Sequence, residues 1–342
     1  MVKSSRKLYN DLGNTSNNCN ERNTQYGKNA KLGGQKREQS IELLRIVLMT
    51  LIVFGHILGH GLGDTTIEMG GRTVSLFPLY FYHVDAFVFI SGYFGIHLKW
   101  KKFLLLIFKM IVYSFFAIGL AVLLKPDMRM SISEIVHNVY PISACDWWFM
   151  SEYLFLMLLS PIINAGIEKL DKRQATILVG VLYLSWFRCT SVLLLFIYIL
   201  GRYLRKYPCT TLETNAVKIL VCTVATFFFL DMIFRANGMY PEKLYNYMSP
   251  FAVVSAVALF YIFKRIHIEW QGVGVIASGT LAAYLITDHE FVRNIFCSTI
   301  SNAVSNNILL FLPVALCVVI LCSCIDVMVT RVLKPVFNIN GK

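Results

Sequence analysis

Two ionisable side chains stand eleven residues apart in the apolar stretch SIELLRIVLMTLIVFGHILGHGL, residues 40–62. On an α-helix, which turns about 100° per residue, Arg45 and His56 share one face and lie about 16 Å apart along the axis. Glu42 and His60 fall close to the same face. Such a histidine can act as a general base on a hydroxyl group, and the arginine can bind an anion or stabilise developing negative charge.

Two further apolar segments carry ionisable side chains. The segment YFYHVDAFVFISGYFGI contains His83 and Asp85, and the segment WWFMSEYLFLMLLSP contains Glu152. Polar groups are costly in hydrocarbon and usually face a cavity or a neighbouring helix. A carboxylate such as Glu152 or Asp85 could orient the ring of His56 or stabilise its protonated form. Trp148 is suited to the membrane interface, or to stacking on a sugar ring at the mouth of a site.

The elements that position these side chains follow from composition. The chain has 342 residues, of which 56% are hydrophobic and only 15% are charged, which indicates an integral membrane protein. Long apolar runs read as helices, because membrane-spanning strands alternate and are about half as long. The predicted fold is an all-α polytopic bundle with ten candidate spans, at roughly 41–62, 75–97, 102–124, 147–167, 174–188, 190–204, 215–234, 248–264, 272–287 and 307–328.

The net charge of +12 is explained by topology. Lysine and arginine gather in the first 37 residues and in the loops on the same side, and this places both termini in the cytoplasm. Nucleic-acid binding is then not needed to explain the charge. We predict a disordered basic tail at 1–39, a membrane domain at 40–334 and a short tail at 335–342. The nine cysteines show no CxxC spacing, and no metal site is expected.

At this point the sequence resembles a known family. Arg45 and His56 match the arginine, ten residues, histidine motif in the first helix of the membrane-bound acyltransferase family 3. The stretches FVFISGYFGI at 87–96, WWFMSEYLFLMLLSP at 147–161 and YILGRYLRKYP at 198–208 are similar to family stretches in the same order. The likeness extends over nearly the whole predicted membrane domain.

The resemblance implies that these enzymes move an acyl group from a cytoplasmic thioester to a sugar hydroxyl. His56 is then the expected base, with Arg45 and Glu152 as catalytic partners. The side chains expected to bind the acceptor are His83, Asp85 and Trp148. The basic side chains on the donor side are Lys99, Lys102, Arg202 and Arg205, each of which a topological role would explain as well.

The chain departs from the family pattern in two places. Where family members often carry two arginines after the SGY stretch, this chain has Lys99 and Lys102, which lack the planar fork of arginine. Where many members read YLIH, this chain reads YLITDHEF, with Thr287 in the place of the histidine and His289 two residues later.

The sequence therefore predicts a multi-pass O-acyltransferase of the cell membrane, specifically of the bacterial inner membrane. We expect acetyl-CoA as donor substrate, no permanently bound cofactor, and a cell-surface polysaccharide or its lipid-linked precursor as acceptor. The alternative is a secondary transporter or flippase for a saccharide or amphipathic substrate, because buried Asp, Glu and His also form proton relays. Transport would leave the substrate chemically unchanged, whereas the enzyme would form a new ester.

Overall fold

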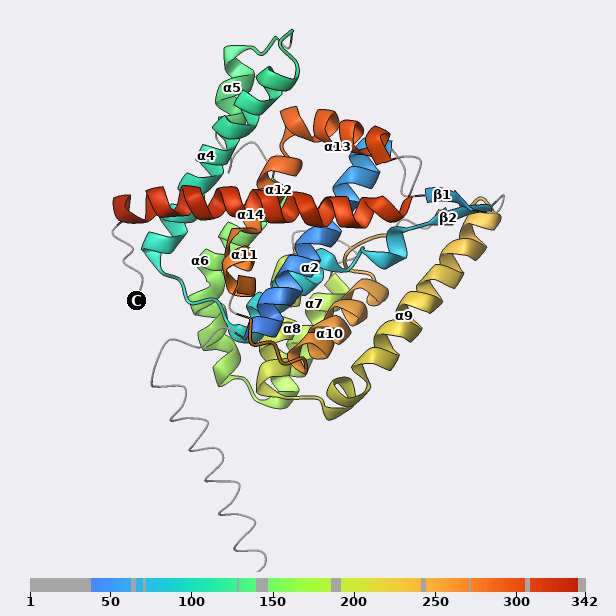
Figure 1. Ribbon diagram of the computed structural model, residues 1–342. Coiled ribbons are helices and arrows are strands. Elements are labelled where there is room, and N and C mark those ends of the chain that lie inside the picture. The colour runs from blue at the N-terminus through green and yellow to red at the C-terminus, as the bar shows by residue number, and fades with distance from the viewer. Residues whose placement is uncertain are drawn as a thin grey trace, which may run out of the picture. The chain divides into compact units, whose positions relative to one another are not determined.

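The computed structural model describes residues 38–62, 66–69, 72–127, 129–139, 147–185, 192–240, 244–270, 272–304 and 308–337. Nearly all of the predicted tail at 1–39 and most of the tail at 335–342 lie outside these ranges. Within them the regular secondary structure is helical apart from one short hairpin, as Figure 1 shows. The predicted all-α membrane fold is therefore confirmed in its main feature.

Five helical segments are long and apolar enough to cross a membrane. The first consists of α2 (Gln39–His56) continued by a π-helical segment, η1 (Ile57–Leu62). The other four match predicted spans: α4 (Trp100–Leu124), α6 (Trp148–Lys169), α9 (Thr210–Ala236) and α14 (Phe311–Val336).

The remaining predicted spans correspond to shorter helices. Their bounds are α3 (His83–Phe94), α7 (Lys172–Ser185), α8 (Leu193–Lys206), α10 (Pro250–Lys264), α11 (Gly272–Gly279) and α12 (Leu281–Thr287). Two short 3-10 helices, η2 (Phe77–Leu79) and η4 (Ile308–Leu310), lie at the starts of predicted spans. The helices outside the predicted spans are α5 (Ile132–Val139) and α13 (Glu290–Val304). The count of ten spans and the side of both termini stay predictions.

The hairpin was not predicted from the sequence. Strand β1 (Thr66–Met69) pairs antiparallel with β2 (Arg72–Ser75), with Thr66 opposite Ser75. The β-branched residues of TIEM and RTVS favour strands, and a Gly-Gly pair separates them in the sequence. The hairpin occupies residues between the first two apolar runs, so it does not interrupt a membrane helix.

Helices α3 and α8 pack closely because each places a glycine at the contact. A Cβ atom on Gly92 would lie 2.3 Å from the carbonyl oxygen of Tyr198, and one on Gly201 would lie 2.7 Å from the backbone nitrogen of Tyr93. Small residues allow such close approach between helices in a membrane. The SGY and ILGRY stretches are thus packed against each other.

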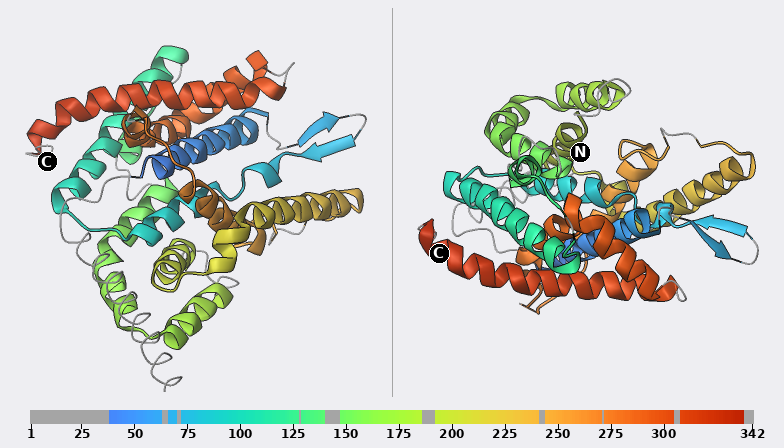
Figure 2. Two further views of the ribbon diagram at one scale, coloured as in Figure 1. Left: turned by 60° about the horizontal axis from the view of Figure 1, so that its bottom comes forward. Right: turned by 90° about the horizontal axis from the view of Figure 1, so that it is seen from above.

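Helix α2 lies at the centre of the helical unit, with contacts to α3, α10, α11, α12 and α14. The two views in Figure 2 show α14 (red) running beside α2 (blue). One hydrophobic cluster joins α3, α8 and α10, and a second joins α2, α11, α12 and α14. Phe87 and Phe149 pack against both clusters, so the rings of these two phenylalanines lie between the clusters.

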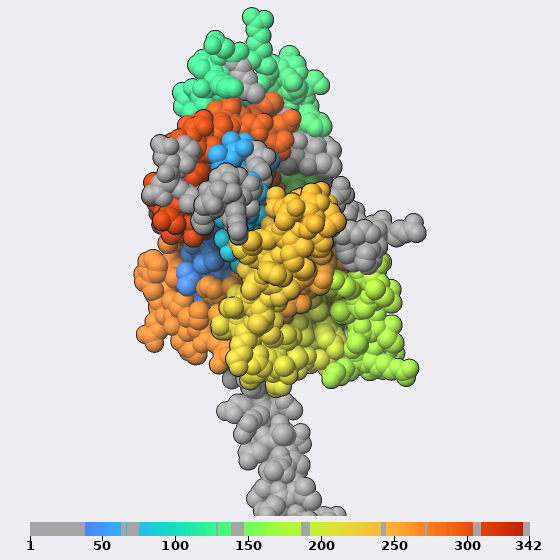
Figure 3. Space-filling view, turned by 90° about the vertical axis from the view of Figure 1, so that its right-hand side faces the viewer, coloured from blue at the N-terminus to red at the C-terminus, as the bar shows by residue number. Residues whose placement is uncertain are grey.

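Helix α9 has the character of a lipid-facing helix. Its yellow surface covers much of the face shown in Figure 3. Val217, Val221 and Phe229 are exposed on it, whereas Phe227 is fully buried against the first cluster. An apolar surface of this kind is stable in lipid tails and unfavourable in water.

A buried ion pair joins α4 to α14. The Lys109 ammonium lies 2.7 Å and 2.9 Å from the two carboxylate oxygens of Asp326. The hydroxyl of Tyr113 donates to Asp326 at 2.8 Å, and the hydroxyl of Thr330 donates at 3.2 Å. Each carboxylate oxygen is thereby satisfied in apolar surroundings, which offsets the cost of burying the charges.

We expect Gly92→Ala to destabilise the protein by about 1–3 kcal/mol, because the added methyl group must push α3 and α8 apart. Gly119→Ala is the matched control, since a Cβ atom there meets no neighbour within 4 Å. The measurement is thermal unfolding of both variants in detergent. Equal unfolding temperatures for the two variants would contradict the packing role of Gly92.

Because Lys109 and Asp326 form an ion pair, we expect substitutions of the two residues to have non-additive effects on the free energy of unfolding. Lys109→Met leaves the Asp326 carboxylate buried and uncompensated, which costs on the order of 3–5 kcal/mol. The double variant Lys109→Met/Asp326→Asn removes both charges and should recover part of that stability. Denaturant unfolding of the single and double variants measures the difference, and strict additivity would refute the coupling.

Candidate active site

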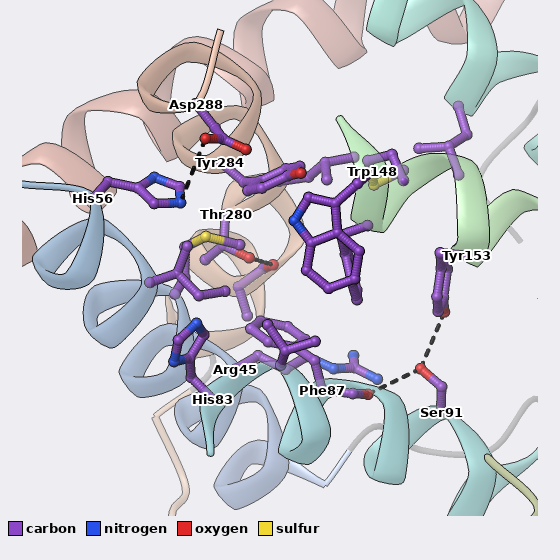
Figure 4. A pocket seen from close by; sticks show the side chains of 18 of the residues that line it. Arg45, His56, His83, Phe87, Ser91, Trp148, Tyr153, Thr280, Tyr284 and Asp288 are labelled. Carbon is purple, nitrogen blue, oxygen red and sulfur yellow. Dashed lines mark hydrogen bonds and ion pairs between the residues drawn. The ribbon is translucent and has the colours of Figure 1, made fainter. Parts of the chain in front are cut away.

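A cavity of about 560 Å³ lies between the two hydrophobic clusters. This volume is in the range of small-molecule binding sites. Arg45 and His56 of α2, His83 of α3 and Trp148 of α6 all line it. Figure 4 shows these four side chains around the same space. The structure therefore brings together four of the residues that the sequence singled out.

Arg45 and His56 line one cavity, which confirms that they share a face of α2. The Arg45 guanidinium donates to Glu42 at 2.8 Å, with the Arg45 side chain 30% exposed and that of Glu42 4% exposed. Glu42 therefore holds the guanidinium at the start of the helix. Arg45 and His56 both line the cavity and stand eleven residues apart, which is about 16 Å along the helix axis.

Thr287, at the end of α12, determines which nitrogen of His56 carries the proton. The Thr287 hydroxyl donates to the carbonyl oxygen of Ala283 at 2.7 Å. The same Oγ1 atom lies 3.0 Å from His56 Nδ1, so it accepts a hydrogen bond from Nδ1–H. In the neutral ring Nε2 then holds the lone pair, which is the form that a general base requires.

The carboxylate beside His56 is Asp288, the residue that follows α12. Its Oδ1 atom lies 3.9 Å from Nε2 of His56 and 3.7 Å from Nε2 of His60. Figure 4 marks the contact with His56, and the Asp288 side chain is only 10% exposed. His60 lies in the π-helical segment η1, a conformation that often occurs at functional sites. One carboxylate thus faces two imidazole rings.

The sequence analysis did not identify Asp288. It is separated from His56 by more than two hundred residues, and helical periodicity relates only residues that are close in sequence. A signal was present in the stretch YLITDHEF, where an acidic residue directly follows an apolar helix. His289, the histidine of that stretch, lies apart from the cavity lining: its Nε2 atom is 3.2 Å from the Ser114 hydroxyl.

Aromatic rings form much of the remaining wall. Nδ1–H of His83 donates to the carbonyl oxygen of Tyr80, which leaves its Nε2 atom as an acceptor. The Trp148 ring stacks on Tyr247 with centroids 5.7 Å apart, and the Tyr247 ring meets His83 edge-on at 5.9 Å. Tyr284 lines the cavity with its ring centroid 6.0 Å from that of His56. Such surfaces can stack on the apolar face of a sugar ring.

Two of the predicted carboxylates do not reach this cavity. Asp85 is fully buried in the first turn of α3, and neither of its oxygens has a hydrogen-bond partner among the described residues. Glu152 is half-buried on α6 and is absent from the cavity lining over the described part of the chain. The position beside His56 that was expected for one of them is occupied by Asp288.

The four basic residues expected at the donor site also lie outside the cavity lining, within the ranges described. Lys99 and Lys102 are exposed at the start of α4. The Arg202 guanidinium donates to Glu168 at 2.6 Å, and the Arg205 guanidinium lies 5.1 Å from the centroid of the Tyr93 ring. Binding of donor phosphates by these side chains stays a prediction.

Comparison with known proteins gives the chemistry of the family. No curated protein and no solved structure matches the chain. The model of a family described as an acyltransferase domain matches residues 38–327, which is most of the chain and all of α2 through the body of α14. The matched region contains every residue of the cavity lining. The chain therefore belongs to acyltransferase family 3 and is a membrane acyltransferase.

Proposed function

We propose that this protein is an O-acyltransferase that moves an acetyl group from acetyl-CoA to a hydroxyl of a cell-surface polysaccharide or its lipid-linked precursor. The observation that carries the proposal is the arrangement of His56 between Thr287 and Asp288 in a cavity that also contains Arg45. It provides a base, a group that fixes the base's tautomer and a carboxylate for the resulting charge. The proposed site of action is the bacterial inner membrane.

The reaction begins with the acceptor hydroxyl at His56 Nε2. As the hydroxyl oxygen attacks the thioester carbonyl carbon, its proton passes to Nε2, and the ring becomes an imidazolium. Asp288, 3.9 Å from Nε2, stabilises that positive charge. Thr287 keeps the other nitrogen protonated throughout, because its own hydroxyl proton is used on Ala283.

The tetrahedral intermediate then collapses. The carbon–sulfur bond breaks, the coenzyme A thiolate leaves, and the proton on Nε2 returns to the sulfur. The products are an ester and free coenzyme A thiol, and the ring is neutral again.

Arg45 acts on a different part of the donor. About 16 Å of helix separates it from His56, too far for both to contact one carbonyl group. Coenzyme A has a long pantetheine arm between its phosphates and its thioester. Arg45 is therefore assigned to the phosphate end of the donor, where a planar guanidinium suits a phosphate group.

The proposal is tested by acyl transfer from labelled acetyl-CoA in membrane vesicles that contain the protein. We expect base-labile label in surface glycan with the wild-type protein and a loss of at least about a hundredfold with His56→Ala, because general-base catalysis supplies roughly 10²–10⁴-fold. Insertion of the variant is checked by cysteine accessibility. Normal glycan acylation by His56→Ala would show that His56 is not the general base. Movement of the acceptor across the membrane without ester formation would favour the transporter alternative.

Arg45→Lys separates donor binding from simple anchoring. An anchor needs only a positive charge on a flexible stem, which lysine provides, so insertion should be normal in either case. If the guanidinium fork holds a donor phosphate, the KM for acetyl-CoA should rise about tenfold or more. The measurement is the dependence of the initial rate on acetyl-CoA concentration, with Arg45→Gln beside it. A wild-type KM in the lysine variant would leave Arg45 an anchor.

A further inference from the structure

Arg293 is a cavity residue that neither the sequence analysis nor the proposed reaction uses. It lies on α13 and lines the cavity together with His56, His60 and Asp288. Helix α13 is held there by close packing against η1, because a Cβ atom on Gly61 would lie 2.6 Å from the carbonyl oxygen of Cys297. Arg293 stands one helical turn before Cys297, so its guanidinium belongs to the His56 end of the cavity.

The guanidinium of Arg293 has no anionic partner among the described residues. The carboxylate of Asp288 is in contact with the two imidazole rings, and no carboxylate of the described chain comes within ion-pair distance of Arg293. Its Nε atom is buried and makes no hydrogen bond within the same ranges. The other arginine of the cavity lining, Arg45, is paired with Glu42.

Arg293 is half-buried, and a guanidinium in such a position without a counter-ion is costly, because it has lost part of its water and gained no charge partner. Two other arginines near helix contacts are paired with a carboxylate: Arg235 with Asp231, and Arg202 with Glu168. An unpaired arginine inside a ligand-sized cavity therefore indicates that the partner arrives with the ligand. Its planar fork binds a carboxylate or a phosphate with two parallel hydrogen bonds.

We propose that Arg293 binds an anionic group on the acceptor, so that the protein selects a glycan carrying a carboxylate or phosphate near the hydroxyl that is acylated. This inference rests on the proposed function, in which the hydroxyl meets His56. The anion on Arg293 fixes one point of the sugar, and stacking on Trp148 and Tyr247 holds its face. The hydroxyl is thereby directed to Nε2 of His56.

The test uses a matched pair of soluble probes, 4-nitrophenyl β-glucuronide and 4-nitrophenyl β-glucoside, which differ only in the carboxylate at the sixth carbon. Binding to the full-length protein in neutral-lipid nanodiscs is measured by calorimetry. We expect the wild type to bind the glucuronide about tenfold more tightly or better, and Arg293→Gln to bind both probes within about twofold. Arg293→Lys should keep part of the preference, and it also serves if the glutamine variant does not fold.

The control is Arg129→Gln, which removes an exposed arginine outside the cavity and should keep the full preference. Equal binding of the two probes by the wild type, or a preference that survives Arg293→Gln, would overturn the proposal. If Arg293→Gln raises the KM for acetyl-CoA and leaves probe binding unchanged, the anion is a donor phosphate and the proposal also fails. If Arg293→Gln binds both probes as the wild type does and is only less stable to heat in phosphatidylglycerol nanodiscs, the anion is a lipid headgroup and the proposal also fails.

A second measurement, the transfer of labelled acetyl groups to the two probes, distinguishes failure of the anion site from failure of the proposed function. A glucuronide that binds through Arg293 but is never acetylated would support the anion site and count against O-acyl transfer to such an acceptor. Acetylation of both probes at equal rates, with no effect of Arg293→Gln, would support O-acyl transfer and overturn the anion site.

Discussion

The contact between α2 and α12 is the interaction on which the site depends. It brings Thr287 and Asp288 to opposite nitrogens of one imidazole ring, His56. Neither neighbour would be effective alone. Without the threonine the ring could adopt either tautomer, and without the carboxylate the protonated ring would have no counter-charge in apolar surroundings. This geometry requires α12 to end beside His56 of α2, so that Thr287 and Asp288 both reach the ring.

The surrounding helices set that level. Helix α14 contacts α2, α11 and α12, and a Cβ atom on Gly279 of α11 would lie 2.5 Å from the carbonyl oxygen of Ser323 on α14. The pair formed by Lys109 and Asp326 ties α14 to α4, which in turn contacts α12 and α13. The close contacts of small residues and the buried ion pair therefore serve the same purpose, which is to keep α12 in register with α2.

Much of this arrangement could be predicted from the sequence, and the parts that could not share a physical cause. Periodicity placed Arg45 and His56 on one face of a helix, and apolar length identified five segments that form helices long and apolar enough to cross a membrane. Both signals are local. The partner of His56 is not local: Glu152 was preferred because it stands inside a long apolar run, whereas Asp288 lies one residue beyond the end of the predicted span at 272–287.

The same limit applies to charge. Sequence position alone does not distinguish Arg293 from an exposed arginine such as Arg129. Only the packing of α13 against η1 shows that its guanidinium belongs to the cavity. Composition therefore predicts the class of protein well, while the assignment of single charges needs the tertiary structure.

The central claim is that Asp288 is the carboxylate that supports His56. The most direct measurement compares the rate of acyl transfer by Asp288→Asn with that by Glu152→Gln, in proteoliposomes with matched amounts of inserted protein. Each substitution keeps shape and removes one charge. We predict that Asp288→Asn is slower by about tenfold or more, because the imidazolium loses its counter-charge, and that Glu152→Gln stays within about twofold of wild type. A normal rate for Asp288→Asn together with a slow Glu152→Gln would contradict it.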